Sequence, residues 1–301
     1  MDGIIIVNKP KNCTSHDIVY KVKKAFKEKV GHTGTLDPMA TGVLPILIGK
    51  GTLVSKYLIN HDKIYEVELE LGRKTDTADS EGKILQEQEV DKTILEKENI
   101  EKTLNTFLGK QKQKPPMYSA IKVNGKKLYE YARKGQTIDV QERDIEIYSI
   151  KLINIKKEEN IVSFEVKCSK GTYIRSLCED IANRLNNIGY MRNLNRTKVG
   201  DFSIENAIDI SKVEVIQEKE EYKEKKEDFL NNNFIPLEKL FEDKEEILLN
   251  EKAVSLILNG VKITRNLTDG IYRLYKLEEN VKTFVGIGVV KDNLLKRDII
   301  V

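Results

Sequence analysis

Residues 31–45 read Gly-His-Thr-Gly-Thr-Leu-Asp-Pro-Met-Ala-Thr-Gly-Val-Leu-Pro. Three glycines and two prolines among these residues exclude a regular helix or a central strand, because glycine costs backbone entropy and proline lacks the N–H donor. Asp37 stands directly before Pro38, and a proline ring pushes the preceding residue out of the α region. We therefore expect a shaped loop, with Asp37 extended at a turn.

A carboxylate on such a loop has several chemical uses. Asp37 can act as a nucleophile, a general base or a metal ligand. The alternative is that Asp37 and Pro38 only build a turn, because aspartate is a common turn residue. Spacing alone favours the turn.

The segments around this loop alternate between strand and helix patterns. Residues 4–7 are apolar and predict a short strand. Thr14 and Asp17 have the spacing of a capping box, which opens a helix. Residues 64–71 and 162–168 alternate apolar and polar side chains, as half-buried strands do. Strands mixed with helices in this way predict an α+β fold.

A second candidate residue lies in the helix predicted at 174–185. Arg175 is in its first turn and off its apolar stripe, where a cation opposes the helix dipole at a cost of roughly 0.3–1 kcal/mol. Glu179, four residues on, can offset this cost as a helical ion pair. A carboxylate from elsewhere in the fold can do the same, and Asp37 is a candidate.

Aromatic and imidazole side chains complete the candidate set. Tyr65 leads the inward face of its strand, where a ring normally only packs. Tyr173, at the junction of strand and helix, is similar. His32, between Gly31 and Thr33, can stack on a base or cap the turn.

The segment 110–127 carries six lysines and no acidic residue, with Pro115-Pro116-Met117-Tyr118 in its middle. Lysines around an aromatic residue on an irregular loop suit phosphate contact and base stacking. A plain solvent-exposed loop is the alternative.

Composition is compatible with a polyanionic partner. Residues 1–200 have a net charge of +8 and residues 201–301 of −5, which gives the +3 of the whole chain. No apolar run is long enough for a membrane span, and the start is too short for a signal peptide, so we expect a cytoplasmic protein. Cys13 and His16 have metal-ligand spacing without a matching second half, so we expect no metal site.

The C-terminal part predicts a separate unit. Residues 218–228 are almost entirely charged and indicate a linker or an exposed helix. Asn250 is placed to cap a short helix that ends at Gly260. Strand-like runs follow at 271–277, 283–290 and 298–301. We expect a catalytic domain at 1–228 and a small β-rich domain at 229–301.

The stretch 31–45 resembles the catalytic-aspartate motif of TruB-family pseudouridine synthases nearly residue for residue. Further segments resemble the same family in the same order, at 7–10, 63–79, 116–133 and 168–200. Several ordered motifs are far more specific than one. The resemblance therefore favours chemistry at Asp37 over a simple turn.

The resemblance implies a pseudouridine synthase fold, with a mixed, largely antiparallel sheet flanked by helices. It also implies a PUA-like C-terminal domain that binds RNA. The implied reaction isomerises uridine 55 in the T-loop of tRNA, in the T-arm stem-loop, without cofactor or metal. We expect a monomer without membrane association.

The resemblance also assigns roles to individual residues. Asp37, Tyr65 and Arg175 are the expected catalytic residues. Five other residues are expected to bind substrate. His32 would lie beside the flipped base, and Tyr173 and Leu194 would form pocket walls. Lys9 would be a structural or phosphate-side contact, and Asp79 an orienting carboxylate.

Three other functions compete with this prediction. A non-catalytic protein that binds or folds tRNA would use the basic segment equally well. A guide-dependent synthase subunit acting on ribosomal RNA is a nearer relative, although the short N-terminus speaks against it. A metal hydrolase would use Cys13, His16, His32 and Asp37.

Overall fold

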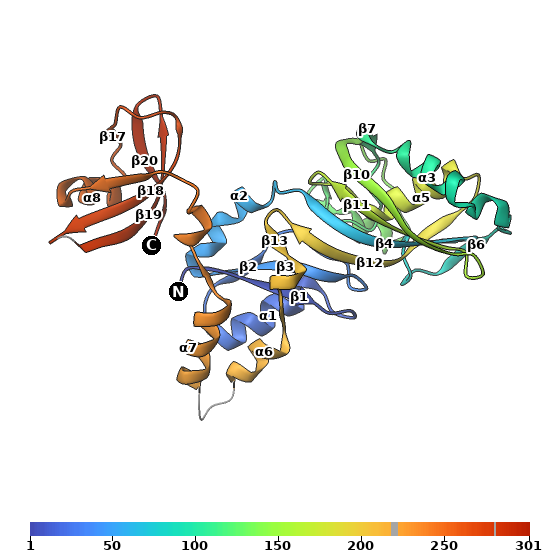
Figure 1. Ribbon diagram of the computed structural model, residues 1–301, viewed down its shortest axis with the longest axis horizontal. Coiled ribbons are helices and arrows are strands. Elements are labelled where there is room, and N and C mark those ends of the chain that lie inside the picture. The colour runs from blue at the N-terminus through green and yellow to red at the C-terminus, as the bar shows by residue number, and fades with distance from the viewer. Residues whose placement is uncertain (218–221, 280) are drawn as a thin grey trace.

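The computed structural model of the chain describes residues 1–217, 222–279 and 281–301 (Figure 1). Within them, strands form an 11-stranded sheet, a 5-stranded sheet and two 2-stranded ribbons. The 5-stranded sheet lies at one end of an elongated molecule, and the large sheet runs through the rest (Figure 1). Helices flank the large sheet, so the α+β prediction is confirmed.

The N-terminal segment forms one half of the large sheet. Strand β1 (Gly3–Lys9) pairs antiparallel with β3 (Thr41–Ile48), which also pairs with β2 (Val30–His32). Helix α1 (Ser15–Phe26) begins at Thr14, and the predicted capping box between Thr14 and Asp17 is confirmed. Its apolar stripe packs on the sheet through Ile18, Val22 and Phe26, among others.

The expectation of an irregular loop over all of 31–45 is wrong at both ends, because Gly31 and His32 lie in β2 and residues 41–45 lie in β3. Gly42 and Pro45 lie inside strand β3, with β1 on one side. Gly42 has φ +112°, and an added Cβ would lie 2.2 Å from the carbonyl oxygen of Arg196, so glycine is needed where the neighbouring strand passes. Pro45 still contributes its carbonyl, which accepts a hydrogen bond from Thr33 N–H at 3.2 Å.

The other half of the large sheet is built from long antiparallel strands. The predicted strands are confirmed as β4 (Lys63–Leu71) and β11 (Ile161–Cys168). The remaining long strands are β7 (Gly109–Gln113), β10 (Arg143–Lys156) and β12 (Gly189–Val199). The order is β14-β1-β3-β12-β4-β11-β10-β7. Strand β12 joins the halves because it pairs antiparallel with β4 and parallel with β3.

Two helices cover the β4–β10 half. Helix α5 (Ile174–Arg184) confirms the predicted helix, and α3 (Lys97–Asn105) packs in the same core. The shorter elements are η1 (Gly49–Val54), α2 (Ser55–Leu58), β5 (Arg73–Thr75), β6 (Ile84–Glu87), η2 (Lys92–Leu95), β8 (Lys122–Val123), β9 (Lys126–Lys127), α4 (Leu128–Ala132), β13 (Phe202–Ser203), η3 (Ile204–Asn206), β14 (Ile208–Asp209), α6 (Ser211–Glu214) and η4 (Val215–Gln217).

The charged stretch at 218–228 is partly helical. Residues 218–221 lie outside the described residues, and α7 (Tyr222–Asn233) follows. Phe229 is buried against Phe26 of α1, with ring centroids 5.6 Å apart, and β15 (Ile235–Pro236) pairs with β1. The division between 1–228 and 229–301 stays a prediction.

The C-terminal part is β-rich, as predicted. Asn250 caps α8 (Glu251–Leu258) by accepting from Ala253 N–H at 2.9 Å. The sheet consists of β16 (Glu246–Leu249), β17 (Ile263–Thr264), β18 (Gly270–Glu278), β19 (Val281–Lys291) and β20 (Leu294–Ile300). The last strand begins four residues earlier than its pattern predicted.

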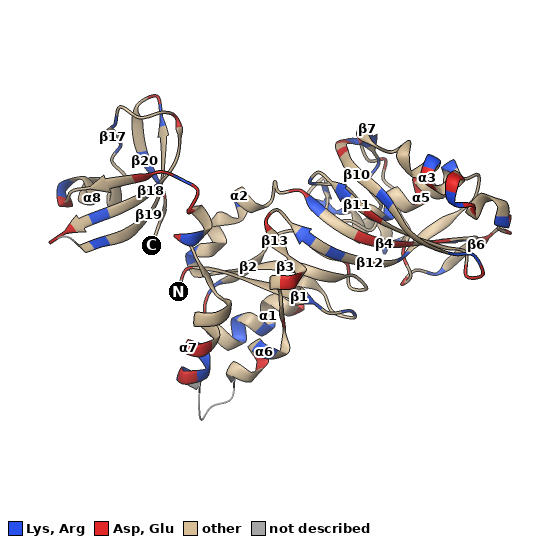
Figure 2. Cartoon of the chain, viewed as in Figure 1, with Lys and Arg blue, Asp and Glu red and all other residues tan. Residues whose placement is uncertain are grey.

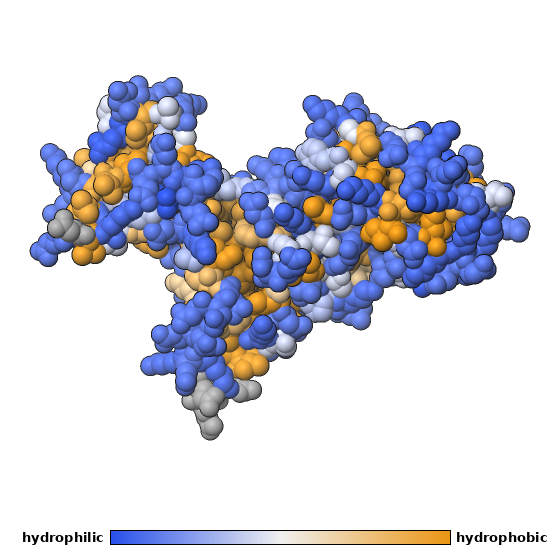
Figure 3. Space-filling view, viewed as in Figure 1, coloured by the Kyte–Doolittle hydropathy of each residue, from blue (hydrophilic) through white to orange (hydrophobic). Residues whose placement is uncertain are grey.

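The C-terminal sheet contacts the rest of the chain through a small apolar cluster. Phe241 of this cluster belongs to η5 (Lys239–Phe241), and Leu237 precedes η5. The other members are Val54, Ile287 and Ile299. Asp298 adds hydrogen bonds from the Tyr57 hydroxyl and the Lys56 ammonium group. Apolar residues show mainly over the middle of the molecule and over the right-hand end of the large sheet (Figure 3).

Charged side chains of both signs are spread over the described chain, and they alternate along α3 and along α7 (Figure 2). In the described part of the chain, no helix is long and apolar enough to span a membrane.

Candidate active site

Asp37 lies on the loop between β2 and β3, and the residues on either side of it are fixed. The hydroxyl of Ser15, at the start of α1, accepts from Leu36 N–H at 2.9 Å and donates to Leu36 O at 3.2 Å. The carbonyl of Asp37 accepts from Ala40 N–H at 3.1 Å, which closes a turn. Lys9 donates to Pro38 O at 3.2 Å. The chain thus holds the backbone of Asp37 from α1 and from β1.

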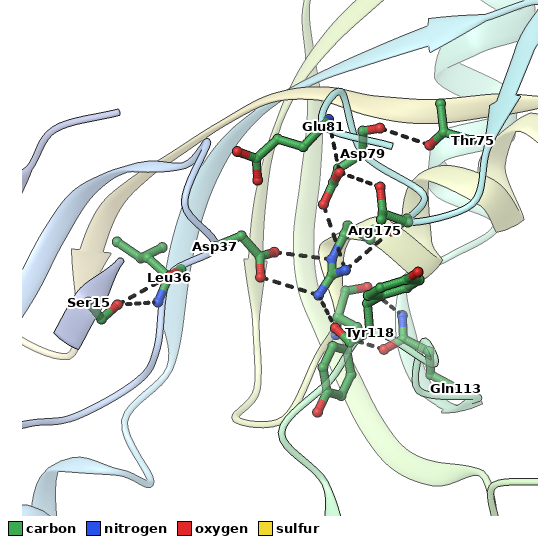
Figure 4. A network of polar contacts seen from close by, with 11 residues as sticks. Ser15, Leu36, Asp37, Thr75, Asp79, Glu81, Gln113, Tyr118 and Arg175 are labelled. Carbon is green, nitrogen blue, oxygen red and sulfur yellow. Dashed lines mark hydrogen bonds and ion pairs between the residues drawn. The ribbon is translucent and has the colours of Figure 1, made fainter. Parts of the chain in front are cut away.

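The side chain of Asp37 forms a two-point ion pair with Arg175 (Figure 4). Arg175 Nε lies 3.1 Å from Oδ2, and Nη2 lies 3.2 Å from Oδ1. The Arg175 side chain is 7% exposed and that of Asp37 is 31% exposed. The partner of Arg175 is therefore the distant carboxylate. Glu179 instead lies 4.0 Å from Lys74.

Backbone carbonyls hold the guanidinium group of Arg175 in place. Nη1 donates to Thr77 O at 3.2 Å, and Nη2 donates to Tyr118 O at 2.8 Å. Thr77 lies on the turn between β5 and β6 of a two-stranded ribbon, and Tyr118 lies on the loop after β7 of the large sheet. Because a guanidinium group is planar and forked, these contacts fix the direction in which it faces Asp37.

A second carboxylate, Asp79, lies on the other side of Arg175 (Figure 4). Its Oδ2 is 3.7 Å from Arg175 Nη1, and its side chain is 5% exposed. Its Oδ1 accepts from Thr77 Oγ1 at 2.6 Å and from Glu81 N–H at 3.1 Å. Asp79 therefore organises the 75–82 turn and faces Arg175, which fits the orienting role expected for it.

Burial and charge act in opposite directions on Asp37. Burial is the largest influence and raises the pKa of its carboxyl above the usual range. The positive charges of Arg175 and Lys9 lower this pKa, and the negative charge of Asp79 raises it. The ion pair thus limits a rise that burial alone would make larger.

Tyr65 and Leu194 lie in the apolar core beneath the loop. Both are buried in one cluster with Leu36 and Met39 of the Asp37 loop. Burial raises the pKa of Tyr65, while the charge and hydrogen bond of Arg196 lower it. The register pairs Arg196 with both Tyr65 and Gly42, so the three residues share one face of the sheet.

Tyr173 is the N-cap residue of α5 and is half-buried. Its N–H donates to Gln113 Oε1 at 2.8 Å, and its carbonyl accepts from Gln113 Nε2 at 3.0 Å. Burial is the largest influence on the phenol and raises its pKa. Tyr173 is thereby placed two residues from Arg175, at the same end of α5.

Lys9 and His32 lie close to the loop without reaching Asp37 by a hydrogen bond. Lys9 is fully buried and donates to the carbonyls of Pro10 at 2.8 Å and Cys13 at 2.7 Å, in addition to Pro38. Of its two expected roles, this geometry favours the structural one. His32 is on β2, and its buried Nδ1 has no partner among the described residues. The pKa of His32 is lowered mainly by burial and to a smaller extent by the positive charge of Arg196.

Two residues that hold the site were not among the candidates. Arg196 is 1% exposed and donates to Val43 O and Gly34 O, each at 2.8 Å. Gln113 is 4% exposed and clamps Tyr173. The available signal was an arginine at the inward position of an alternating strand, opposite Tyr65. Gln113 gave no comparable signal.

The basic segment is largely exposed. All six lysines of 110–127 are exposed except Lys127, which is half-buried. The segment includes the ribbon of β8 and β9 and continues into α4. Tyr118 lies within it and contributes the carbonyl that binds Arg175. Lys110 and Lys112 lie on β7, whereas the other four lysines lie on the segment after β7 that also carries Tyr118.

The residues proposed for a metal hydrolase do not assemble. Among the described residues, no group of three or more His, Cys, Asp or Glu side chains is arranged to hold a metal ion. The Cys13 thiol donates to Pro10 O at 3.3 Å, and Asp37 faces a guanidinium group. The arrangement is that of a carboxylate whose ionised form is stabilised by a guanidinium group against the effect of burial on its pKa.

Two family models match consecutive parts of the chain. Residues 21–174 match the "TruB family pseudouridylate synthase (N terminal domain)", and residues 175–242 match the "tRNA pseudouridylate synthase B C-terminal domain".

The chain belongs to the TruB family. A tRNA pseudouridine synthase B of Clostridium kluyveri is 45% identical over 97% of this chain and 96% of its own length. The proteins of the same name from Clostridium tetani and Alkaliphilus oremlandii are 44% and 43% identical, over 96% and 97% of this chain and 95% and 94% of their own lengths. These alignments span the candidate site and the C-terminal sheet.

Chains in two solved structures have a fold similar to that of this TruB-family chain. An H/ACA RNP bound to a substrate RNA containing 2′-deoxyuridine has a chain with TM-score 0.66 and 24% identity. The archaeal box H/ACA sRNP Nop10-Cbf5 complex has one with TM-score 0.65 and 24% identity. Each match covers 96% of this chain and 78% of the other. At this identity the likeness shows the fold alone. The PUA-like character of residues 229–301 stays a prediction.

Proposed function

We propose that this TruB-family chain converts uridine 55 in the T-loop of tRNA to pseudouridine, with Asp37 as the reacting carboxylate. The observation that carries the proposal is the two-point pair between Asp37 and the buried guanidinium group of Arg175. The relatives named tRNA pseudouridine synthase B support tRNA as the substrate.

The target base must leave its stack before the reaction. The C1′–N1 bond breaks, the uracil turns, and a C5–C1′ bond forms, so the base needs free space. Extruding a nucleotide costs a few kcal/mol, and loop RNA makes this cheaper than a duplex does. The exposed lysines of 110–127 suit the flanking phosphates.

Asp37 acts in its ionised form on either of two routes. In the first, a carboxylate oxygen bonds to C1′ as the C1′–N1 bond breaks, and the bond electrons leave with the uracil. In the first route this ester bond breaks when C5 of the uracil attacks C1′. In the second, Asp37 removes the C2′ proton as the C1′–N1 bond breaks, which gives a glycal intermediate, and the proton returns to C2′ when C5 bonds to C1′. In both, Arg175 opposes the neutralising effect of burial, and C5 finally loses its proton while N1 gains one.

The other expected residues have supporting roles. Tyr65 would stack on the detached uracil, and its hydroxyl would assist departure of the C5 proton. Tyr173 and Leu194 would form walls of the pocket, and His32 would occupy space beside the flipped base. Asp79 would keep Arg175 facing Asp37, because it attracts Nη1 and leaves Nε and Nη2 to Asp37.

Chemical mapping of pseudouridine in an unmodified tRNA transcript tests the proposal. Incubation with the chain should produce one new modification, at position 55, and a transcript with cytidine at that position should remain unmodified. Modification at another position would refute the site assignment. A transcript that is bound but never modified would favour a protein that only binds or folds tRNA.

A further inference from the structure

Gln113 binds both backbone hydrogen-bonding groups of Tyr173, its N–H and its carbonyl, with one side chain. Its amide accepts from Tyr173 N–H at 2.8 Å and donates to Tyr173 O at 3.0 Å (Figure 4). A primary amide presents its donor and acceptor side by side, as the backbone of a neighbouring strand does. Gln113 is the last residue of β7, the strand at the end of the sheet order, and is 4% exposed.

The segment that starts at Gln113 makes two further contacts with the first turn of α5. Ser176 Oγ donates to Lys114 O at 3.0 Å, and Arg175 Nη2 donates to Tyr118 O at 2.8 Å. Residues 113–118 therefore contact three residues at the start of α5, namely Tyr173, Arg175 and Ser176. The middle position carries the guanidinium group that holds Asp37.

The N-terminus of α5 lacks a cap of its own. Tyr173 is extended, with φ −96° and ψ 110°, and makes no side-chain cap hydrogen bond. The direction in which the first turn starts is therefore not set by the helix sequence, as it is at Thr14 of α1. The two hydrogen bonds from Gln113 supply this restraint from a different strand.

We propose that Gln113 is a positioning residue of the active site, which sets the start of α5 so that Tyr173 forms a pocket wall and Arg175 meets Asp37. The proposal rests on the proposed function, because it takes Asp37 as the reacting group. Gln113 itself touches neither Asp37 nor the proposed substrate. It acts through the backbone of Tyr173.

The chain contains a matched control for a buried amide clamp. Asn187 is 5% exposed, accepts from Gly72 N–H and Ile188 N–H at 3.0 Å each, and donates to Glu89 O at 3.1 Å. It follows the C-terminal end of α5, opposite to the end that carries Arg175. Loss of either amide should cost comparable stability, but only Gln113 lies beside the ion pair.

The test compares Gln113→Met with Asn187→Leu in single-turnover assays on a T-arm RNA stem-loop over a range of pH, together with thermal unfolding. Both variants should unfold at lower temperature. At a temperature where both are folded, Gln113→Met should turn over at least tenfold more slowly, since misplacement by about 1 Å can cost about 10²-fold. Its RNA affinity should stay close to wild type.

The pH profile separates positioning from simple folding. Arg175 and Lys9 lower the pKa of Asp37, and Asp79 raises it. If Arg175 moves away, this pKa rises, so the acid limb of the Gln113→Met profile should shift to higher pH. The Asn187→Leu profile should keep the wild-type limb. If Gln113→Met does not fold, Gln113→Asn, which keeps the amide on a shorter side chain, should show the same shift to a smaller extent.

The outcomes are distinguishable. If the Gln113 variants lose stability as the Asn187 variant does, with wild-type rate and acid limb, Gln113 is only structural and the inference is overturned. If the wild-type chain forms no pseudouridine, the proposed function itself fails, whatever the variants do.

Discussion

Arg175 and Arg196 are both buried, but their guanidinium groups meet different partners. Arg175, at the start of α5, contacts the carboxylates of Asp37 and Asp79 as well as two carbonyls. Arg196, on β12, donates to the carbonyls of Val43 and Gly34, on either side of the loop that carries Asp37. One arginine faces the Asp37 carboxylate, and the other holds the ends of the loop.

The two arginines therefore affect different properties of the loop: Arg175 affects the ionisation of Asp37, and Arg196 affects the conformation of the backbone. A guanidinium group beside a carboxylate favours its ionised form, so Arg175 acts on the pKa of Asp37. A guanidinium group beside carbonyls satisfies acceptors that would otherwise be buried without a donor, so Arg196 acts on the stability of the loop. Substitutions at the two sites should therefore affect different measurements.

The largest expected effect is at Asp37. Asp37→Asn keeps the shape and much of the hydrogen bonding to Arg175 but cannot act as a nucleophile or base. Turnover should fall by about 10⁴-fold or more, as for other reacting residues, while RNA affinity changes little. Quantifying pseudouridine after long incubation checks this. Appreciable product from the Asn variant would mean that another group reacts with the sugar.

The next effect should follow from Arg175→Met, which removes the charge and keeps most of the volume. We expect turnover to fall by about 10²-fold, because both the position and the charge state of Asp37 are affected. The wild-type acid limb should already lie above the usual range for aspartate, because burial raises this pKa.

In the Arg175→Met variant the limb should move further toward higher pH. The sign follows because Arg175 lowers the pKa of Asp37. Turnover rates of wild type and Arg175→Met, measured from acid to neutral pH, test this shift. A limb that stays in place would show that Arg175 does not control the ionisation of Asp37.

Arg196→Met should act mainly on stability. It leaves the carbonyls of Val43 and Gly34 without their donor in a buried place, at about 1–3 kcal/mol each. We expect a loss of about 2–4 kcal/mol in the free energy of unfolding by denaturant. The folded fraction should keep an acid limb near that of wild type. If the acid limb of Arg196→Met shifted as far as that of Arg175→Met, Arg196 would also control the ionisation of Asp37, contrary to this prediction.

Side-chain patterns predicted much of this fold, whereas backbone partners escaped prediction. The capping box of Thr14 and the alternation in β4 depend on local chemistry that the sequence displays. The pairing of Arg175 with Asp37 was a candidate because a cation at a helix N-terminus needs compensation. Every residue offers a carbonyl, however, so the sequence cannot show which ones Arg175 and Arg196 bind.

The same limit explains the error at residues 41–45. Gly42 and Pro45 discourage a strand when judged alone, yet both are accommodated by their neighbours. Glycine lets the backbone of β12 pass closely, and the Pro45 carbonyl accepts from Thr33. Gln113 was missed for a related reason, because its partners are the backbone N–H and carbonyl of a residue 60 positions away.

The smallest expected effect is on RNA affinity, from two lysines that contact neither Arg175 nor Arg196. Lys122 and Lys126, on β8 and β9, are exposed on the loop system whose Tyr118 carbonyl binds Arg175. Replacing both with alanine should weaken RNA binding several-fold and reduce the slope of log affinity against log salt by about one per lost phosphate contact. Lys97→Ala, on the exposed face of α3, is the control. Because these lysines would act on binding alone, the turnover rate of bound RNA should be unchanged; a slower rate at saturating RNA would mean that the loop also acts on Arg175.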